Sequence, residues 1–223
     1  MAVIHHTTLK PTKLELLTSW IPTRSWYRGT AGEPELAKAG GFRLDDPLGE
    51  VGIEFMVVTD SACPDPASYL VPLTYRGAPL EGAEHALVGI MEHGVLGRRW
   101  AYDGCHDPVL VAGFLALLEG RAEAQDQNSS DAPDREVCRS YTGERLLPAA
   151  FTGATDDGEG TVLRAPHGPA LRLNRVLRPA ADDPHLPPRG AIGHVAGSWR
   201  MPGGGRAQGL FAVLHPRPHG RIS

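Results

Sequence analysis

The strongest periodic pattern in the chain is a helical stripe of apolar residues that spans positions 110–118. Within it Leu, Val and Phe recur at intervals of three and four residues, which is the spacing of one helix face. The stripe follows Asp107 and Pro108, a pair typical of a helix start, because Asp caps the first turn and proline is tolerated there. The pattern therefore predicts a helix that begins after Asp107 and ends at Gly120.

A shorter helix is predicted near the start of the chain. Thr12 and Glu15 have the T-x-x-E spacing of a capping box, in which each side chain accepts a hydrogen bond from the other residue's backbone amide. Apolar residues follow on one face, and Pro22 lacks the amide needed to continue the helix. We expect this helix to end near Trp20.

Alternation of apolar and polar residues predicts strands through the rest of the chain. It is clearest in 51–59, whereas the glycines of 86–102 favour a bent hairpin over a helix. Pro72 should place its strand at a sheet edge or a bulge, because proline cannot donate to a neighbouring strand. The remaining strand candidates are residues 2–9, 42–44, 69–75, 161–164, 170–177, 192–199 and 209–214.

These elements predict an α+β fold, mainly an antiparallel sheet with a few short helices. Turn-rich connections between consecutive strands favour antiparallel pairing. We divide the chain into an α+β region over 1–120, a polar linker or loop over 121–135, a β-rich extension over 136–215 that packs on the same domain, and a frayed tail over 216–223. The linker contains no large apolar residue that would anchor it.

Composition argues against several classes of function. The net charge is −4 with an isoelectric point near 6.2, so we expect no nucleic-acid partner. Three widely spaced cysteines do not form a disulfide framework and are typical of a reducing compartment. The sequence shows neither a signal peptide nor a long apolar stretch. We therefore expect a cytoplasmic protein with no membrane partner.

Devices that hold nucleotide phosphates are incomplete in this sequence. Residues 203–206 are glycine-rich, but they contain neither the lysine nor the Ser or Thr of a phosphate-binding loop, and we interpret them as a turn. The strings at 106–108 and 167–169 do not form a kinase catalytic loop. The sequence therefore predicts no catalytic residue and no cofactor for the chain alone.

Metal binding and nucleophilic catalysis are weakly indicated. His85, His93, Cys105, His106 and Asp107 lie close in sequence but lack the spacing of a zinc site, and we predict no metal site. The adjacency of Cys105 and His106 does not give the geometry of a catalytic triad. Paired carboxylates lie in Gly- and Pro-rich loops, where Asp stabilises turns. These pairs are Asp45 with Asp46, Asp156 with Asp157, and Asp182 with Asp183.

A cluster of aromatic and basic residues follows the first predicted helix. It comprises Trp20, Arg24, Trp26, Tyr27 and Arg28. Trp, Tyr and Arg are the residues most enriched at the energetic centres of interfaces, which favours a docking surface. Alternatively, the rings cover the core beside the helix. The pattern leaves both interpretations open.

Three stretches resemble the N-terminal cap domain of maltokinases. Residues 14–29 look like the start of those caps, where a helix that ends in tryptophan precedes an Arg-Trp-aromatic-Gly type of sequence. Residues 69–73 are similar to their Tyr-x-x-Pro-Leu strand, and residues 100–108 resemble their Tyr-Asp…Asp-Pro turn into a helix. The resemblance extends over the region 1–120.

The resemblance implies an α+β cap of the kind that precedes an aminoglycoside-phosphotransferase-like kinase. Such kinases phosphorylate maltose or a related sugar with ATP and magnesium. The catalytic loop and magnesium ligands belong to the kinase part, for which the sequence offers no counterpart. The resemblance thus implies a cap-like protein standing alone, with ATP and Mg²⁺ only in complex with a kinase partner.

Three hypotheses for function follow. The first is a non-catalytic accessory or regulatory protein in maltose, trehalose or α-glucan metabolism that docks on a sugar kinase or another glycan enzyme. The second is a kinase-class subunit that supports ATP-dependent sugar phosphorylation in a complex. The third is a carbohydrate-binding module with exposed rings that stack on sugars. The candidate partner- or sugar-binding residues are Trp20, Arg24, Trp26, Tyr27, Arg28, Trp100, Tyr102 and Asp103.

Overall fold

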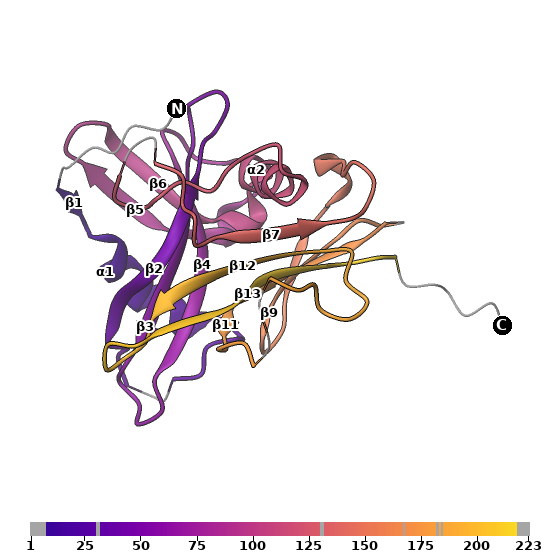
Figure 1. Ribbon diagram of the computed structural model, residues 1–223. Coiled ribbons are helices and arrows are strands. Elements are labelled where there is room, and N and C mark those ends of the chain that lie inside the picture. Colours follow the sequence, from indigo (N-terminus) through magenta and orange to yellow (C-terminus); the bar gives the residue numbers. More distant parts are fainter. Residues whose placement is uncertain are drawn as a thin grey trace.

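The protein is described by a computed structural model that covers residues 8–29, 32–129, 132–166, 168–181, 183 and 185–217. It is mostly antiparallel sheet with two α-helices (Figure 1), which confirms the predicted α+β class. The helices are α1 (Lys13–Trp20) and α2 (Pro108–Glu119), with single 3₁₀ turns at Ile21–Thr23, Glu84–Ala86, Gly104–His106 and Pro148–Ala150. The strands are β1 (Leu9–Lys10), β2 (Leu36–Leu44), β3 (Gly52–Asp60), β4 (Ala67–Arg76), β5 (Leu87–His93), β6 (Gly97–Asp103), β7 (Cys138–Tyr141), β8 (Ala154–Asp156), β9 (Gly160–Arg164), β10 (Ala170–Asn174), β11 (Val176–Leu177), β12 (Gly193–Arg200) and β13 (Arg206–His215).

Both helices begin as their capping signals predict. In α1 the Glu15 amide donates to Thr12 Oγ1 over 3.2 Å, and the Thr12 amide donates to Glu15 Oε2 over 2.6 Å. In α2 the Val109 amide donates to Asp107 Oδ1 over 2.9 Å, and Gly120 ends the helix at a φ of 78°. The sequence signals therefore fixed the position of both elements correctly.

The strands form a circuit of hydrogen-bonded neighbours that closes on itself. The order runs β4–β3–β2–β12–β13–β10, all antiparallel. Arg175 separates β10 from β11, and β11 pairs with β4 at Val176 with Tyr69 and Leu177 with Ser68. Since β11 continues the path of β10, the last strand of the series returns to the first. Strands from the two ends of the chain thus share one barrel-like wall.

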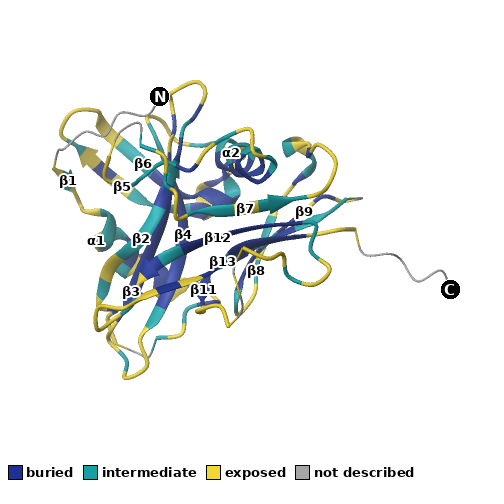
Figure 2. Ribbon diagram, in the orientation of Figure 1, coloured by how far each residue is buried: buried dark blue, intermediate teal, exposed yellow. Residues whose placement is uncertain are grey.

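The interior of this circuit is the main hydrophobic core. Phe42 of β2 stacks on Phe55 of β3 at 4.5 Å between ring centroids, and Phe55 meets Phe114 of α2 at 4.8 Å. Phe211 of β13 lies 6.2 Å from Phe42 on the other side. Figure 2 shows α2 and the crossing strands β3, β4, β12 and β13 largely in the buried class. The core therefore contains side chains from both the 1–120 region and the extension.

A second core covers the outer face of β3 and β4. There α1 and the turn after it place Leu17, Ile21 and Trp26 against Met56 and Tyr69. Successive residues of a strand point to opposite faces, so Phe55 faces the first core and Met56 the second. Both faces of these strands are consequently buried.

The expectation that Pro72 marks an edge strand or a bulge is wrong, because β4 has neighbours on both sides. On one side it pairs with β3 throughout, and on the other it pairs with β11 at one end and β6 at the other. The Leu70 amide donates to the Arg175 carbonyl over 2.9 Å, so the backbone amides of every second residue from Leu70 point to the side of β11 and β6. Pro72 is one of these residues and falls between the two partners, where its missing amide costs no ladder hydrogen bond.

The segment 121–135 is held more closely than its polar composition predicted. Ala124 is buried, and Gln125 bridges to both Arg43 of β2 and Pro133. Backbone hydrogen bonds thus anchor the segment without a large apolar residue. The prediction also missed β7, β8 and the first residues of β2, whereas residues 2–7 and 218–223, His167 and Asp182 lie outside the described part of the chain.

Replacing Gly160 tests the closure at β9 and β10. A Cβ at Gly160 would lie 2.2 Å from the carbonyl oxygen of Leu173, so Gly160→Ala must push two paired strands apart. We expect a loss of about 2 kcal/mol in the free energy of unfolding in guanidinium chloride. Gly158→Ala is the matched control, because a Cβ there meets nothing within 4 Å. Equal stability of the two variants would contradict the tight β9–β10 contact.

Candidate functional site

The aromatic segment after α1 lies largely inside the second core. Trp26 has 0% of its surface exposed and Trp20 has 6%. The Trp26 ring meets Trp20 at 5.9 Å and Tyr69 at 5.7 Å between centroids. Trp26 therefore offers no ring face to a sugar, and its burial removes it from the set of stacking platforms.

The polar residues of the same segment contact the chain's own extension. Ser25 Oγ donates to the Asp157 carbonyl over 3.3 Å, and the Arg28 guanidinium donates to the Gly158 carbonyl over 3.1 Å and pairs with Glu159. Asp157 also accepts two hydrogen bonds from Arg172, at 2.7 and 2.9 Å. The β8–β9 turn thus occupies part of the surface that the sequence suggested for docking.

Arg24 and Tyr27 are the partly exposed members of the cluster. The Arg24 guanidinium lies 4.9 Å from the centre of the Trp20 ring and donates to Thr23 Oγ1. The Tyr27 hydroxyl donates to Asp60 Oδ2 over 2.9 Å. Burial and this hydrogen bond to a carboxylate raise the pKa of Tyr27, so the hydroxyl stays protonated as a donor.

Trp100 and Tyr102 belong to a separate small cluster. Both lie on β6: Tyr102 forms a buried cluster with Ala83 and Ala86 from the segment before β5, and Trp100 packs against that cluster. The Leu80 amide donates to the Tyr102 hydroxyl over 2.9 Å, whereas Trp100 is half-buried. The aromatic candidates therefore do not form one groove.

Asp103 is the candidate that the structure ties most firmly to the rest of the molecule. Arg175 Nη2 donates to both carboxylate oxygens of Asp103, over 2.7 Å to Oδ1 and 2.6 Å to Oδ2, and both side chains are buried. Arg175 Nε also donates to Thr161 Oγ1 over 2.7 Å, and its guanidinium carbon lies 5.4 Å from the Trp26 ring. Burial alone would lower the pKa of Arg175, but the Asp103 carboxylate outweighs it and raises that pKa. The pair joins β6, β9 and the β10–β11 junction.

The cysteine and histidine candidates do not assemble a catalytic or metal site. The described residues contain no group of three or more His, Cys, Asp or Glu placed to hold a metal ion. His85 Nε2 lies 3.1 Å from His106 Nδ1, and the two rings meet edge to face at 4.6 Å. Burial raises the pKa of the Cys105 thiol, which is the opposite of nucleophile activation. Asp107 caps α2 and pairs with Arg76 at 2.7 Å.

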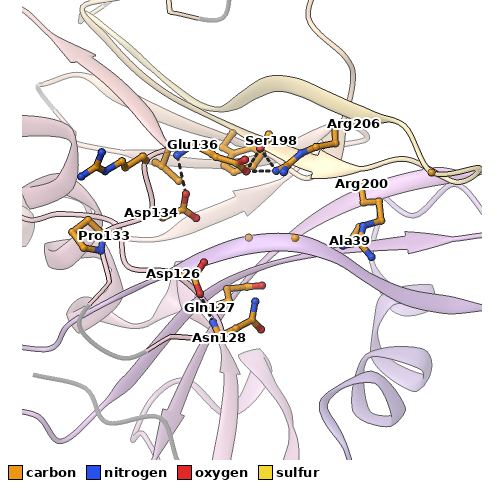
Figure 3. A pocket seen from close by; sticks show the side chains of 16 residues that line it. Ala39, Asp126, Gln127, Asn128, Pro133, Asp134, Glu136, Ser198, Arg200 and Arg206 are labelled. Carbon is orange, nitrogen blue, oxygen red and sulfur yellow. Dashed lines mark hydrogen bonds and ion pairs between the residues drawn. The ribbon is translucent and has the colours of Figure 1, made fainter.

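A polar hollow of about 640 Å³ opens beside β2 (Figure 3). Residues 39–41 of β2 line one side, residues 126–128 and 133–137 of the loop before β7 line the second, and the β12–β13 hairpin lines the third through Ser198 and Arg206. Figure 3 shows these side chains converging from the three elements. Size and convergent polar groups make this hollow a candidate ligand site.

The hollow exists because β2 and β12 diverge. They are paired only at Gly40 with Trp199, and the register of β2 against β3 shifts between Lys38 and Gly40. A Cβ at Gly41, whose φ is 119°, would lie 2.0 Å from the Phe55 carbonyl oxygen. This site requires glycine, and the bulged strand leaves room for the loop to approach.

Hydrogen bonds hold the loop that lines the hollow. The Arg43 amide donates to the Gln125 carbonyl and the Gln125 amide to the Arg43 carbonyl, each over 2.9 Å. The Asp126 amide donates to the Ala132 carbonyl over 2.7 Å and joins the two arms of the loop. Opposite them, Glu136 of the loop accepts from Ser198 and pairs with Arg206 of the hairpin. The hollow is thereby braced on two sides.

Comparison with known proteins bears on the cap-like part of the chain. The strands β2–β6 of this part lie between α1 and α2 along the chain, and the aromatic segment is buried against β3 and β4. Residues 20–107 match the family model of the maltokinase N-terminal cap domain. The resemblance inferred from the sequence motifs is confirmed over this stretch, which is less than half of the chain. No curated protein matches the chain.

The match to the maltokinase cap contains all eight candidate residues, but not the residues outside it that they contact. Arg175, which pairs with Asp103, and the β8–β9 turn, which contacts Arg28, lie outside it. Most of the residues that line the hollow also lie beyond it, in the loop before β7 and in the β12–β13 hairpin. Among the described residues, neither helix is long and apolar enough to cross a membrane.

Sequence reasoning missed the residues that line the hollow and the role of Arg175. Asp126, Gln127, Asp134 and Glu136 lie in or beside a segment that its composition marked as a linker. Their density of carboxylates and amides between two strand regions was a usable signal. Arg175 carried one as well, because it falls at the next alternate position after Leu171 and Leu173, where an apolar residue is expected.

Breaking the Asp103–Arg175 pair should destabilise the protein strongly. Arg175→Met leaves the Asp103 carboxylate buried without its partner, and we expect a loss of about 3–5 kcal/mol in urea unfolding. The exposed pair of Arg98 with Glu92 is the control, and Arg98→Met should change stability by less than about 1 kcal/mol. A small effect at Arg175 would show that the pair does not hold the extension to the cap.

Acid should weaken the fold through His106. Burial lowers the pKa of His106, and the nearby His85 lowers it further. Since the folded pKa lies below the unfolded one, the stability that neutral His106 contributes is present above the unfolded value of about 6.5 and is lost as pH falls through the folded pKa. His106→Gln should flatten unfolding free energy against pH between 7 and 5, whereas His215→Gln at an exposed site should not. Proton NMR titration of His106 measures its pKa directly.

Proposed function

We propose that the chain is a non-catalytic, cap-like accessory module that docks on a sugar kinase or another enzyme of maltose, trehalose or α-glucan metabolism. The match of residues 20–107 to the maltokinase N-terminal cap domain is the observation that carries this proposal. Caps of that family accompany a kinase, so we propose a kinase-related protein as the partner. The cytoplasm, where such enzymes have their substrates, is the compartment in which we place the chain.

The charges buried in the chain support a binding role over a catalytic one. Asp103 is committed to Arg175, and Asp107 to Arg76 and the start of α2. Glu54 is buried on β3 and is engaged by Lys13 and the Tyr75 hydroxyl. Carboxylates paired in this way serve the fold, whereas a general base must be able to reach a substrate proton.

The surface left for a partner differs from the one that the sequence suggested. Trp20 and Trp26 are inside the core, and Arg28 contacts the β8–β9 turn. Arg24 and the half-buried Trp100 remain accessible within the matched region. We therefore place the docking contacts at Arg24 and Trp100 and assign the other candidates to the framework beneath them.

Complementation in trans tests the proposal. The catalytic part of a maltokinase, purified without its own cap, is assayed for ATP-dependent maltose phosphorylation with and without this chain. We expect the chain to raise kcat/KM about tenfold, equivalent to ~1.4 kcal/mol of transition-state stabilisation. Arg24→Glu and Trp100→Ala should weaken the effect, whereas Arg145→Glu, an exposed substitution outside the matched region, should not.

Two results would contradict the proposal. Maltose phosphorylation by the chain alone would contradict the non-catalytic role. No change in kinase activity together with no binding by analytical ultracentrifugation would remove the docking role. Circular dichroism of each variant shows whether a lost effect arises from a lost contact or from unfolding.

A further inference from the structure

We propose that the polar hollow beside β2 binds an uncharged, hydroxyl-rich small molecule of the size of a mono- or disaccharide. This inference rests on the geometry of the hollow and does not depend on the proposed kinase partner. No family match extends over the loop and the hairpin that form two of its three sides.

The size and composition of the hollow exclude an apolar ligand. Its volume of about 640 Å³ lies within the range of small-molecule sites, roughly 300–1,000 Å³. Carboxylates, guanidiniums, amides and a hydroxyl make up most of the lining, and the one aromatic ring among its described residues is the buried Phe211. A ligand that fills this space must exchange its hydrogen bonds with water for hydrogen bonds with the protein.

Among the described residues of the lining, the charges balance, which favours a neutral ligand. Asp126, Asp134 and Glu136 supply three carboxylates, and Arg135, Arg200 and Arg206 supply three guanidiniums. A phosphorylated ligand would meet the carboxylates, and a cationic one the guanidiniums, at a like-charge cost. Hydroxyl groups both donate and accept, so a polyol can use acidic and basic side chains together.

The loop carboxylates are oriented in advance for such contacts. Asp126 Oδ1 accepts the Asn128 and Ser129 amides at 2.7 and 2.8 Å, and Asp134 Oδ1 accepts the Glu136 amide at 2.9 Å. Among the described residues, no hydrogen bond reaches Oδ2 of either aspartate. Figure 3 shows the two side chains pointing toward one another from the two arms of the loop. Each thus keeps one acceptor oxygen for a ligand hydroxyl without losing its position.

The opposite side supplies donors. Arg200, at the end of β12, extends toward Ala39 of β2 in Figure 3, and the described residues give its guanidinium no ion-pair partner. On the loop side, Gln127 lies beside Gly41 of β2, because its Nε2 donates to the Phe55 carbonyl and Glu54 Oε1 of β3, each over 3.4 Å. Acceptors on the loop therefore face donors on the hairpin across a space braced by Glu136 and Arg206.

The test is isothermal titration calorimetry of the full chain with five probes. Glucose, maltose and trehalose are neutral, glucosamine is cationic, and glucose 6-phosphate is anionic. We expect at least one neutral sugar to bind and both charged sugars to bind at least about tenfold more weakly, a difference of ~1.4 kcal/mol. Shifts of the Gln127 and Asn128 side-chain amide signals in NMR spectra should accompany binding and locate it.

Variants separate this site from any other. Asp134→Asn and Arg200→Gln change one polar group each, and Asn128→Trp fills the hollow from an exposed loop position. Each should weaken binding of the neutral sugar about tenfold or more without a change in melting temperature, and the exposed Asp65→Asn control should bind as the parent does. Failure of all three neutral sugars to bind, tighter binding of a charged sugar, or binding that survives Asn128→Trp would overturn the proposal.

Discussion

The buried contact between Asp103 and Arg175 is the interaction on which the arrangement of the two parts depends. Both charged groups are buried away from water, so each is stabilised only by the other. Asp103 ends β6 in the matched cap, and Arg175 stands where β10 passes into β11. The pair fixes the point at which the extension returns to β4, and Trp26 packs beneath the same guanidinium. The matched region and the extension are thereby joined in one folded unit.

Where the buried ion pair fills the space between two parts of the fold, the divergence of β2 and β12 leaves space open. A single residue pair joins the strands, and beyond it β12 turns to β7. The loop before β7 and the hairpin after β12 close over the gap mostly with polar side chains. A barrel sealed at every strand would have no such opening. The irregular seam is thus the part of the framework in which binding chemistry gathers.

Local signals in the sequence predicted the elements well and their partners poorly. Capping by Thr12 and Asp107 placed both helices, because those contacts lie within four residues. The neighbours of Pro72 were missed, because they are set by Arg175, about a hundred residues further along the chain. The candidate site behaved alike: composition marked Trp26 as an aromatic of interest, but only the packing of β4 and α1 decides that it is buried. The match to cap domains was predictable because its motifs are short and ordered.

The pairing of β11 with β4 has a consequence for folding during synthesis on the ribosome. Gly40 pairs with Trp199 and Tyr69 with Val176, so the wall cannot be completed until Trp199 has emerged. Until then β2 and β4 present open edges and an uncovered apolar face, the kind of surface that associates with other nascent chains. The connectivity of the fold therefore keeps these edges open until late in synthesis, and a fragment that ends near position 107 would keep them open.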